Sequence, residues 1–259
     1  MALTHGNETA GLCVLNELLT LIRSGLVKTQ LSIIFALGNT AAAQKNKRFL
    51  EEDLNRCYGE QQTQSLESQR AQVLKKYLSQ STFLLDLHQT QTLSNRSFFV
   101  SLQDFNCVHK AININPFSTI VSLKSSKMVK GSSPLTSTHF MYTKNKMGLT
   151  LEMGTKGLDP YQISEGLFTC LKTIELAQSP SQEQKSFSGE YFHLIDRYIV
   201  EETKGLELNE SIHNFQYVKK GEQLGQSKNT IIQAPVEGYI LFPKIPQGKN
   251  KVMARSGEP

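Results

Sequence analysis

Neither a long apolar run nor a secretory leader is visible in this 259-residue sequence. No apolar run approaches the roughly 20 residues that a membrane-spanning helix needs. The first residues contain no basic segment followed by a long apolar stretch, so no cleaved signal is indicated. These absences predict a cytoplasmic protein that does not act within a membrane.

Paired cysteines and blocks of basic charge are also missing. The four cysteines lie far apart and form no CxxC motif, which argues against a thiolate zinc site and a disulfide framework. The formal net charge is +5, and the basic residues are scattered rather than gathered with aromatics into one block. This pattern argues against nucleic-acid binding and suits a small anionic substrate.

The first two thirds of the sequence alternate helical and strand signals, which is typical of an α/β domain with a largely parallel sheet. Apolar residues at helical spacing and short apolar runs define the elements. Helices are expected over 8–25, 65–80 and 159–178, and strands over 30–39, 81–90, 97–102, 117–123 and 147–154.

A polar stretch rich in Ser and Gln then interrupts the pattern, and we predict a linker over 180–189. It separates a catalytic domain, 1–179, from a small β domain, 190–259, whose short strands are punctuated by Gly and Pro. The latter is similar to barrel-sandwich folds of the lipoyl type. Because the expected tight hairpin holds no lysine, we expect no covalently attached cofactor.

A histidine and a glutamate three residues apart, His5 and Glu8, open the first predicted helix. On one helical turn both side chains can reach a single metal ion, and Gly6 between them allows close backbone approach. Alone, such a pair is more often a capped helix start with a surface ion pair. His88, however, lies at the carboxyl end of a predicted strand, where binding residues gather. Two His and one Glu are typical ligands of a catalytic zinc.

Two further groups carry the chemistry that hydrolysis needs. Glu152 lies near the end of an apolar strand, where desolvation would raise its pKa toward the range of a general base. A solvated strand-end carboxylate is the alternative. Arg48, Asn55 and Arg56 lie within nine residues and offer parallel hydrogen bonds to a carboxylate. The two arginines are alternatively structural partners of neighbouring acids at the surface.

The motifs HGNE, DLNR, DLH and LEMG occur in this order, and their combination resembles the succinylglutamate desuccinylase and aspartoacylase family, a branch of the zinc carboxypeptidase superfamily. The resemblance covers essentially the whole chain. It implies an α/β fold with a zinc-carboxypeptidase-like mixed sheet flanked by helices, and a small C-terminal β domain. The implied activity is zinc-dependent hydrolysis of a linear amide that is not a peptide bond, in an anionic N-acyl amino acid.

The resemblance also implies roles for individual residues. His5, Glu8 and His88 match the ligands of one Zn²⁺ per chain. Glu152 matches the glutamate that activates water and then protonates the leaving amine, and Arg48 matches the arginine that polarises the scissile carbonyl.

Other positions match residues that bind the substrate or support the site. Asn55 and Arg56 match the pair that grips the substrate carboxylate, and Tyr239 is expected to reach the pocket from the β domain. Asp53 is expected to support the DLNR loop from behind, and Asp86 to orient the metal site.

Two departures from the family pattern leave alternatives open. Only Met1 to Thr4 precede His5, so we expect either a sheet that lacks most of the strand leading into HGNE or a start further upstream. The arginine by which aspartoacylase holds its substrate's side-chain carboxylate is replaced by a neighbourhood with Lys144 and Lys146, which argues against N-acetylaspartate. A carboxypeptidase-type metallopeptidase acting on a small peptide and a degenerate, non-catalytic binding module are the alternatives. The sequence is also compatible with a homo-oligomer.

Overall fold

The computed structural model describes residues 1–60, 63–102, 104–123, 135–179, 185–198, 205–227, 230–244 and 254–258. The helices are α1 (Ala10–Arg23), α2 (Thr40–Gln44), the 3-10 helix η1 (Leu54–Arg56), α3 (Leu66–Leu78), α4 (Phe105–Ile114), α5 (Ser137–Thr143) and α6 (Pro160–Gln178). The strands are β1 (Phe83–Thr90), β2 (Phe98–Leu102), β3 (Thr119–Leu123), β4 (Met147–Thr155), β5 (Glu190–Tyr198), β6 (Glu207–Leu208), β7 (Gln216–Val218), β8 (Gln223–Gln226), β9 (Ile231–Gln233), β10 (Gly238–Leu241) and β11 (Ala254–Glu258).

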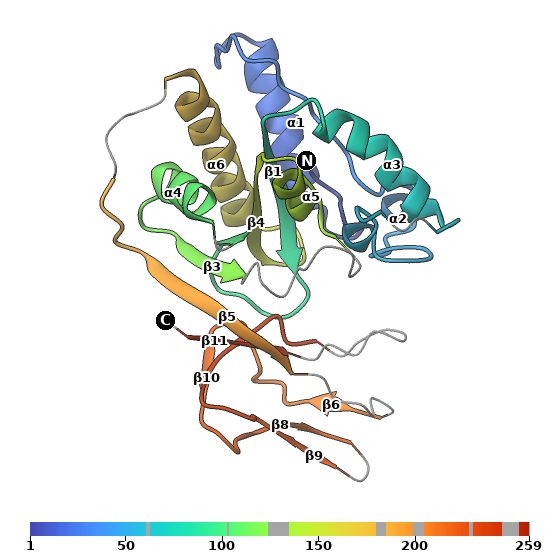
Figure 1. The fold of residues 1–259 in the computed structure, drawn as a ribbon, viewed down its shortest axis with the longest axis vertical. Coiled ribbons are helices and arrows are strands. Elements are labelled where there is room, and N and C mark those ends of the chain that lie inside the picture. The colour runs from blue at the N-terminus through green and yellow to red at the C-terminus, as the bar shows by residue number, and fades with distance from the viewer. Residues whose placement is uncertain are drawn as a thin grey trace.

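A mixed sheet forms the centre of the molecule, with the strand order β1-β4-β2-β3-β5-β11-β10-β7 (Figure 1). Strands β1 and β4 are parallel, as are β2 and β3, whereas β2 and β4 are antiparallel. Helices α1, α4 and α6 cover one face of β1, β4 and β2, while α3 and α5 lie on the other. The predicted α/β class with a mixed, helix-flanked sheet is therefore confirmed.

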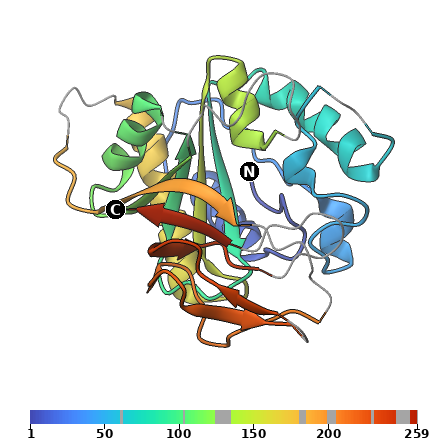
Figure 2. The same cartoon turned by 60° about the horizontal axis from the view of Figure 1, so that its bottom comes forward.

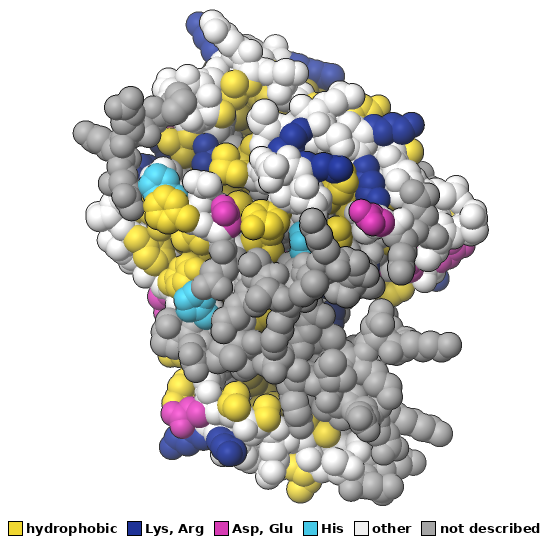
Figure 3. Space-filling model, in the orientation of Figure 1, with side chains coloured by type: hydrophobic (Ala, Val, Ile, Leu, Met, Phe, Trp, Pro, Cys, Tyr) yellow, Lys and Arg dark blue, Asp and Glu magenta, His cyan; other side chains and the backbone are white. Residues whose placement is uncertain are grey.

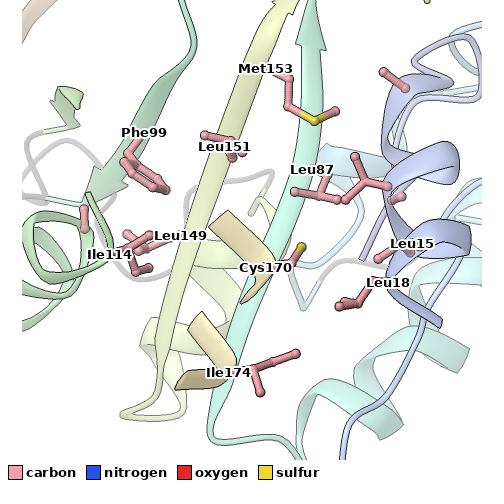
Figure 4. Close-up of a cluster of buried hydrophobic side chains, with 14 of the residues drawn as sticks. Leu15, Leu18, Leu87, Phe99, Ile114, Leu149, Leu151, Met153, Cys170 and Ile174 are labelled. Atoms are coloured by element: carbon pink, nitrogen blue, oxygen red, sulfur yellow. The ribbon is translucent and has the colours of Figure 1, made fainter. Parts of the chain in front are cut away.

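Alternation along β1 and β4 sends their side chains to two different layers. Leu87 of β1 and Leu151 and Met153 of β4 pack with the apolar stripe of α1 and with α6 in one buried cluster (Figure 4). Leu15 and Leu18 belong to that stripe. Burial of each such leucine contributes about 1.5–3 kcal/mol. Residues of opposite parity face α3 and α5, and these include the polar residues at the carboxyl ends of both strands.

Most predicted elements are present, and one is not. The helices α3 and α6 and the strands β1 to β4 form where the sequence pattern predicts them. At the start of α6, the side chain of Asp159 accepts from the backbone N–H of Tyr161, and Pro160 occupies the first turn. The predicted strand over 30–39 is wrong, since only one isolated bridge, Ala2 with Leu37, forms there.

The first three residues lie beside β1 and lead directly into the HGNE motif. The amino group of Met1 donates to the carbonyl of Leu85 at 2.7 Å, and Leu87 N donates to Met1 O at 2.9 Å. On the other side, Ala2 N donates to Ala36 O at 3.0 Å. Even this short pairing delivers the next residues to the carboxyl end of β1.

The central sheet continues into the C-terminal strands. Strand β5 pairs with β3 in parallel and with β11 in antiparallel orientation, so β5 and β11 lie side by side (Figure 2). A separate three-stranded sheet, β6-β8-β9, adjoins a small apolar core of its own. The domain boundaries stay a prediction, and residues 180–184 of the predicted linker lie outside the described residues.

Within the described part of the chain, no helix combines the length and the apolar character needed to cross a membrane.

Candidate active site

Three segments converge at the carboxyl ends of β1 and β4. The loop before α1 carries His5 and Glu8, and β1 carries His88, which lies within the strand rather than beyond its end. All three side chains are buried, and one ligand atom from each lies within 4.8 Å of the others. The structure therefore brings together the three residues predicted to hold a metal.

The Glu8 carboxylate lies between the two imidazoles. Its Oε1 is 2.8 Å from His5 Nδ1, and its Oε2 is 3.0 Å from His88 Nδ1. The backbone N–H of Gln89 also donates to Oε2 at 3.1 Å. Burial opposes ionisation, but His5 and His88 outweigh it and hold the pKa of Glu8 well below its usual range. The carboxylate is thus kept in the charged form that a metal ligand requires.

The outer nitrogen of each imidazole faces a second carboxylate. His5 Nε2 lies 2.9 Å from Asp53 Oδ1, and His88 Nε2 lies 3.1 Å from Asp86 Oδ2. Asp86 is fixed in turn by Thr4 Oγ1 at 2.9 Å. A carboxylate on the outer nitrogen favours the tautomer whose lone pair is on Nδ1, toward the metal side. Asp53, expected to support the DLNR loop, thus contacts His5, and Asp86, expected to orient the metal site, contacts His88.

The buried polar atoms of this centre fit a divalent metal ion. Glu152 Oε2 is buried and makes no hydrogen bond within the described residues. An orphaned carboxylate oxygen is expensive in a protein interior unless a ligand satisfies it. Two His and one Glu form a donor set typical of catalytic zinc.

Gly6 is required by the tight packing of the HGNE loop on α2. A Cβ at this position would lie 2.3 Å from Ala43 N and 2.6 Å from Lys47 O, both backbone atoms. A side chain would therefore displace the loop. The close approach anticipated from the sequence is confirmed.

Glu152 lies beside the three clustered residues because β1 and β4 pair in register, with His88 opposite Glu152. Burial raises the pKa of Glu152 to about 7. The side chain lines a cavity together with His5, Glu8 and Arg48. A carboxyl with a pKa near neutrality can both accept and return a proton.

Arg48 spans the space between the cluster and the rest of the cavity. Its Nη1 lies 2.7 Å from Glu8 Oε1, and its Nη2 lies 3.7 Å from Asp53 Oδ2. With the Gln91 amide oxygen turned toward it, Nε and Nη1 donate at 3.1 and 3.0 Å. These contacts fix the plane of the guanidinium at the cavity wall.

The loop that carries Arg48 and Asp53 is anchored by Glu67 of α3. One carboxylate oxygen accepts from Asn39 Nδ2 at 2.9 Å and from Leu50 N at 2.7 Å, and the other accepts from the next two backbone N–H groups. The sequence gives no hint of this role, because an acidic residue in a first helical turn ordinarily serves only the helix dipole.

We expect Glu67→Gln to lower the free energy of unfolding by about 2–3 kcal/mol, because an amide nitrogen would face buried backbone donors. Burial opposes ionisation of Glu67, but the hydrogen bonds from Leu50 and Asn39 outweigh it, so its pKa lies below the ordinary 4.5. The stability is therefore present above about pH 4.5 and lost as the pH falls through the lowered pKa. Denaturant unfolding of the wild type and of Glu67→Gln at pH 7 and pH 3.5 measures their free energies of unfolding. The difference between the two proteins should shrink at the lower pH. Glu60→Gln, at an exposed position nearby, is the control, and an equal effect there would contradict the role of Glu67.

Three predicted binding residues are not brought to the cavity. The Oδ1 of Asn55 accepts from Ser137 N at 2.9 Å, and Arg56 Nη1 donates to the backbone oxygen of Asn55 at 2.7 Å. The Tyr239 ring packs against the rings of Phe192 and Tyr217, with centroids 5.1 and 5.3 Å apart. Asn55 thus anchors the DLNR loop to α5, Arg56 bonds within that loop, and Tyr239 belongs to a cluster of aromatic rings.

The C-terminal part of the chain supplies one wall of the cavity, as the expectation for Tyr239 implied, but through other residues. Its described lining comprises His5, Glu8, Arg48, Gln89, Thr90, Gln91, Thr92, Glu152, Asn214, Phe242, Pro243 and Lys244. The last four residues are more than 50 positions beyond Glu152. No local motif marks them, so only the tertiary structure identifies this wall.

The chain is similar to known proteins over most of its length. Residues 1–174 match the family model described as the succinylglutamate desuccinylase/aspartoacylase catalytic domain. A succinylglutamate desuccinylase of Pseudomonas fluorescens (strain SBW25) is 26% identical over 273 residues, covering 96% of this chain and 79% of that protein.

Solved structures show the same fold. The succinylglutamate desuccinylase from Vibrio cholerae superposes with a TM-score of 0.77 at 19% identity, covering 99% of this chain and 79% of that one. Murine aminoacylase 3 superposes with a TM-score of 0.70 at 19% identity, covering 99% and 93%. The C-terminal strands are thus part of the shared architecture.

Proposed function

The chain belongs to the succinylglutamate desuccinylase/aspartoacylase family, and from this premise we propose that it hydrolyses the amide bond of an N-acyl amino acid. One observation carries the proposal: a buried His-Glu-His cluster, a half-buried glutamate and an arginine meet at one cavity. The names of the relatives, desuccinylase and aminoacylase, support a deacylase.

We propose that His5, Glu8 and His88 hold one Zn²⁺. When bound, the ion would supply Lewis-acid polarisation of the amide carbonyl and would make water more acidic. The two imidazoles present Nδ1 to the Glu8 carboxylate, while Asp53 and Asp86 hold them in place from the other side.

Glu152 is the proposed proton carrier. Its unpartnered, buried Oε2 accepts a proton from the attacking water and later gives that proton to the leaving amine nitrogen. The raised pKa suits this double use, because neither protonation state is strongly favoured near neutral pH.

Arg48 is the proposed donor to the oxyanion that develops on the scissile carbonyl. Its guanidinium is already oriented by Glu8 and Gln91, so little reorganisation is needed as the charge develops. We further propose that the substrate is a small anionic molecule and that neither nucleic acid nor a membrane is a partner.

The test is a panel of substrates assayed with and without a chelator. N-succinyl and N-acetyl derivatives of single amino acids should be hydrolysed, whereas peptides with free carboxyl termini should not. Removal of the metal by the chelator should abolish turnover. Preference for the peptides would favour a metallopeptidase. Absence of turnover on the whole panel by the zinc-loaded protein would favour a binding module.

A further inference from the structure

We propose that Gln89 of β1 and Gln162 of α6 form a bracket that positions the base Glu152 against the His-Glu-His cluster. The inference rests on the proposed function. It assigns a positioning role to two buried glutamines that lie outside the motifs HGNE, DLNR, DLH and LEMG. Neither side chain acts on the reacting bond, because both act through the segment of β4 that carries Glu152.

The pairing of β1 with β4 changes register directly after Glu152. His88 pairs with Glu152 and Thr90 pairs with Thr155, so two steps along β1 (88 to 90) correspond to three along β4 (152 to 155). Such a β-bulge adds a residue to one strand, disrupts the hydrogen bonds of the ladder and turns the neighbouring side chains. The direction in which Glu152 points therefore depends on how the bulge is held.

Gly154 gives the bulge its backbone conformation. Its φ of +128° is one that residues with a side chain rarely adopt. A Cβ at this position would lie 3.0 Å from Nε2 of Gln162 and 3.1 Å from its Cδ. The glycine of the LEMG motif is thus required both by the bulge and by the close approach of the Gln162 side chain.

The two glutamine amides bond the backbone carbonyls of the bulged segment. Gln162 Nε2 donates to Thr155 O at 2.9 Å, and Gln89 Nε2 lies 3.2 Å from the same oxygen. Gln89 Nε2 also donates to Gly157 O and to Gln162 Oε1, at 2.7 Å each. The exposed fractions are 2% for Gln89 and 7% for Gln162, so these amides replace water as partners of the carbonyls.

Gln89 connects the bracket to the HGNE loop. Its Oε1 accepts from Ala10 N at the start of α1 at 3.1 Å, and its backbone N–H donates to Glu8 Oε2 at 3.1 Å. One residue thus contacts the loop that carries Glu8 and, through its amide nitrogen, the strand end that carries Glu152. The bracket therefore fixes the base relative to the cluster.

Helix α6 carries Gln162 in its first turn, beside the end of β4. Further along the helix, Cys170 and Ile174 pack with Leu151 and Met153 of β4 in one buried cluster (Figure 4). Because this packing fixes the helix on the strand, the Gln162 amide is held at the bulge.

A neutral amide suits this position. A lysine or arginine could also donate to the carbonyls, but it would place a positive charge in the interior, near Glu8 and Glu152. The basic side chains visible in Figure 3 lie instead at the surface, where several gather over α3 and α5. The bracket therefore holds Glu152 without adding a charge to the site.

The experiment compares Gln162→Met with the wild type, both alone and combined with Glu152→Gln. Methionine keeps roughly the length of the side chain and removes its hydrogen bonds. Gln178→Met is the matched control, because Gln178 bonds the backbone of Gln30 and Lys28 from the exposed far end of α6, about 24 Å along the helix.

Four quantities are measured on each protein. Steady-state kinetics with N-succinylglutamate and N-acetylglutamate gives kcat and KM, and elemental analysis gives the zinc content. Hydrogen exchange followed by mass spectrometry reports on the backbone of residues 153–157. Thermal melting verifies that each variant is folded.

We expect Gln162→Met to lower kcat by about 10- to 100-fold, with KM within about twofold and unchanged zinc content, because a small displacement of the base weakens proton transfer. Exchange within residues 153–157 should become about tenfold faster. In the Glu152→Gln background the same substitution should lower the residual rate by less than about twofold, since no base is left to position. Gln178→Met should change none of these quantities.

Equal fold-losses in both backgrounds would overturn the role of Gln162, because the residue would then not act through Glu152. Unchanged kcat, unchanged exchange within residues 153–157, or a loss of zinc together with activity would also overturn it. If Gln162→Met does not fold, Gln162→Asn takes its place, since it withdraws the amide by one methylene group. Failure of both variants to fold would assign Gln162 to the stability of the fold and would overturn a positioning role.

Wild-type protein that hydrolyses neither compound would contradict the proposed function. The exchange measurement then decides by itself whether the bracket holds this segment: faster exchange confined to residues 153–157 in Gln162→Met supports the bracket, and unchanged exchange overturns it.

Discussion

Glu152→Gln is expected to lower kcat by about 10³-fold while zinc content stays at the wild-type level. The amide cannot accept the proton of the attacking water, but it keeps the shape of the side chain. Glu152 is not one of the three clustered ligands, so the metal site should be unaffected. Steady-state kinetics gives kcat, and elemental analysis of the same preparation gives the zinc content.

The same substitution should leave the protein at least as stable as the wild type. Glu152 Oε2 is buried without a hydrogen-bond partner among the described residues, so this oxygen makes no hydrogen bond that the amide would lose. Glu175→Gln, at an exposed position of α6, is the control for loss of one negative charge. Turnover above one tenth of the wild-type rate in the zinc-loaded Glu152→Gln protein would exclude Glu152 as the base.

Arg48→Lys should lower kcat by about 10²- to 10³-fold, with a smaller change in KM. The planar guanidinium reaches Glu8 and Gln91 at once, whereas an ammonium group is a single point of charge on a flexible stem. A lysine therefore keeps the positive charge but does not hold its N–H donors in a fixed orientation. Initial rates over a range of substrate concentrations separate the two parameters.

Arg23→Lys, at the exposed end of α1, is the matched control and should change neither parameter. A rise in KM with unchanged kcat in Arg48→Lys would contradict a role in stabilising the oxyanion. That result would instead assign Arg48 to ground-state binding of the substrate.

The His5-Glu8-His88 cluster was predictable because its determinants are local. The sequence places a histidine and a glutamate three residues apart and a second histidine at a strand end. Once the order of the strands is known, these three side chains are expected to lie together. Glu152 follows from the same logic, since in-register pairing of β1 and β4 places it opposite His88. Alternation along β1 likewise puts Asp86 on the same face as His88.

The binding residues were less predictable because side-chain direction depends on packing. Asn55 and Arg56 follow Asp53 closely in sequence, yet only Asp53 contacts the cluster, through His5. The Asn55 side chain instead accepts a hydrogen bond from the backbone of Ser137, the first residue of α5. Tyr239 lies in β10 and joins a ring cluster. The lining residue Phe242 comes three positions later, after the chain leaves the strand.

Parts of the fold also escaped prediction for identifiable reasons. The segment 30–39 has the composition of a buried strand, but it forms only a single bridge, with the short N-terminal segment. Helices α4 and α5 were missed because they are short, and α5 is fixed by tertiary contacts with β1 and β4 rather than by a long apolar stripe.

The most direct test is the zinc content of the purified chain, measured by elemental mass spectrometry beside His88→Ala, with His109→Ala as the control outside the cluster. The account predicts about one zinc per chain in the wild type and the control, and almost none in folded His88→Ala. A wild-type protein that takes up no zinc when supplied with it would contradict the account. So would a His88→Ala protein that retains the full amount.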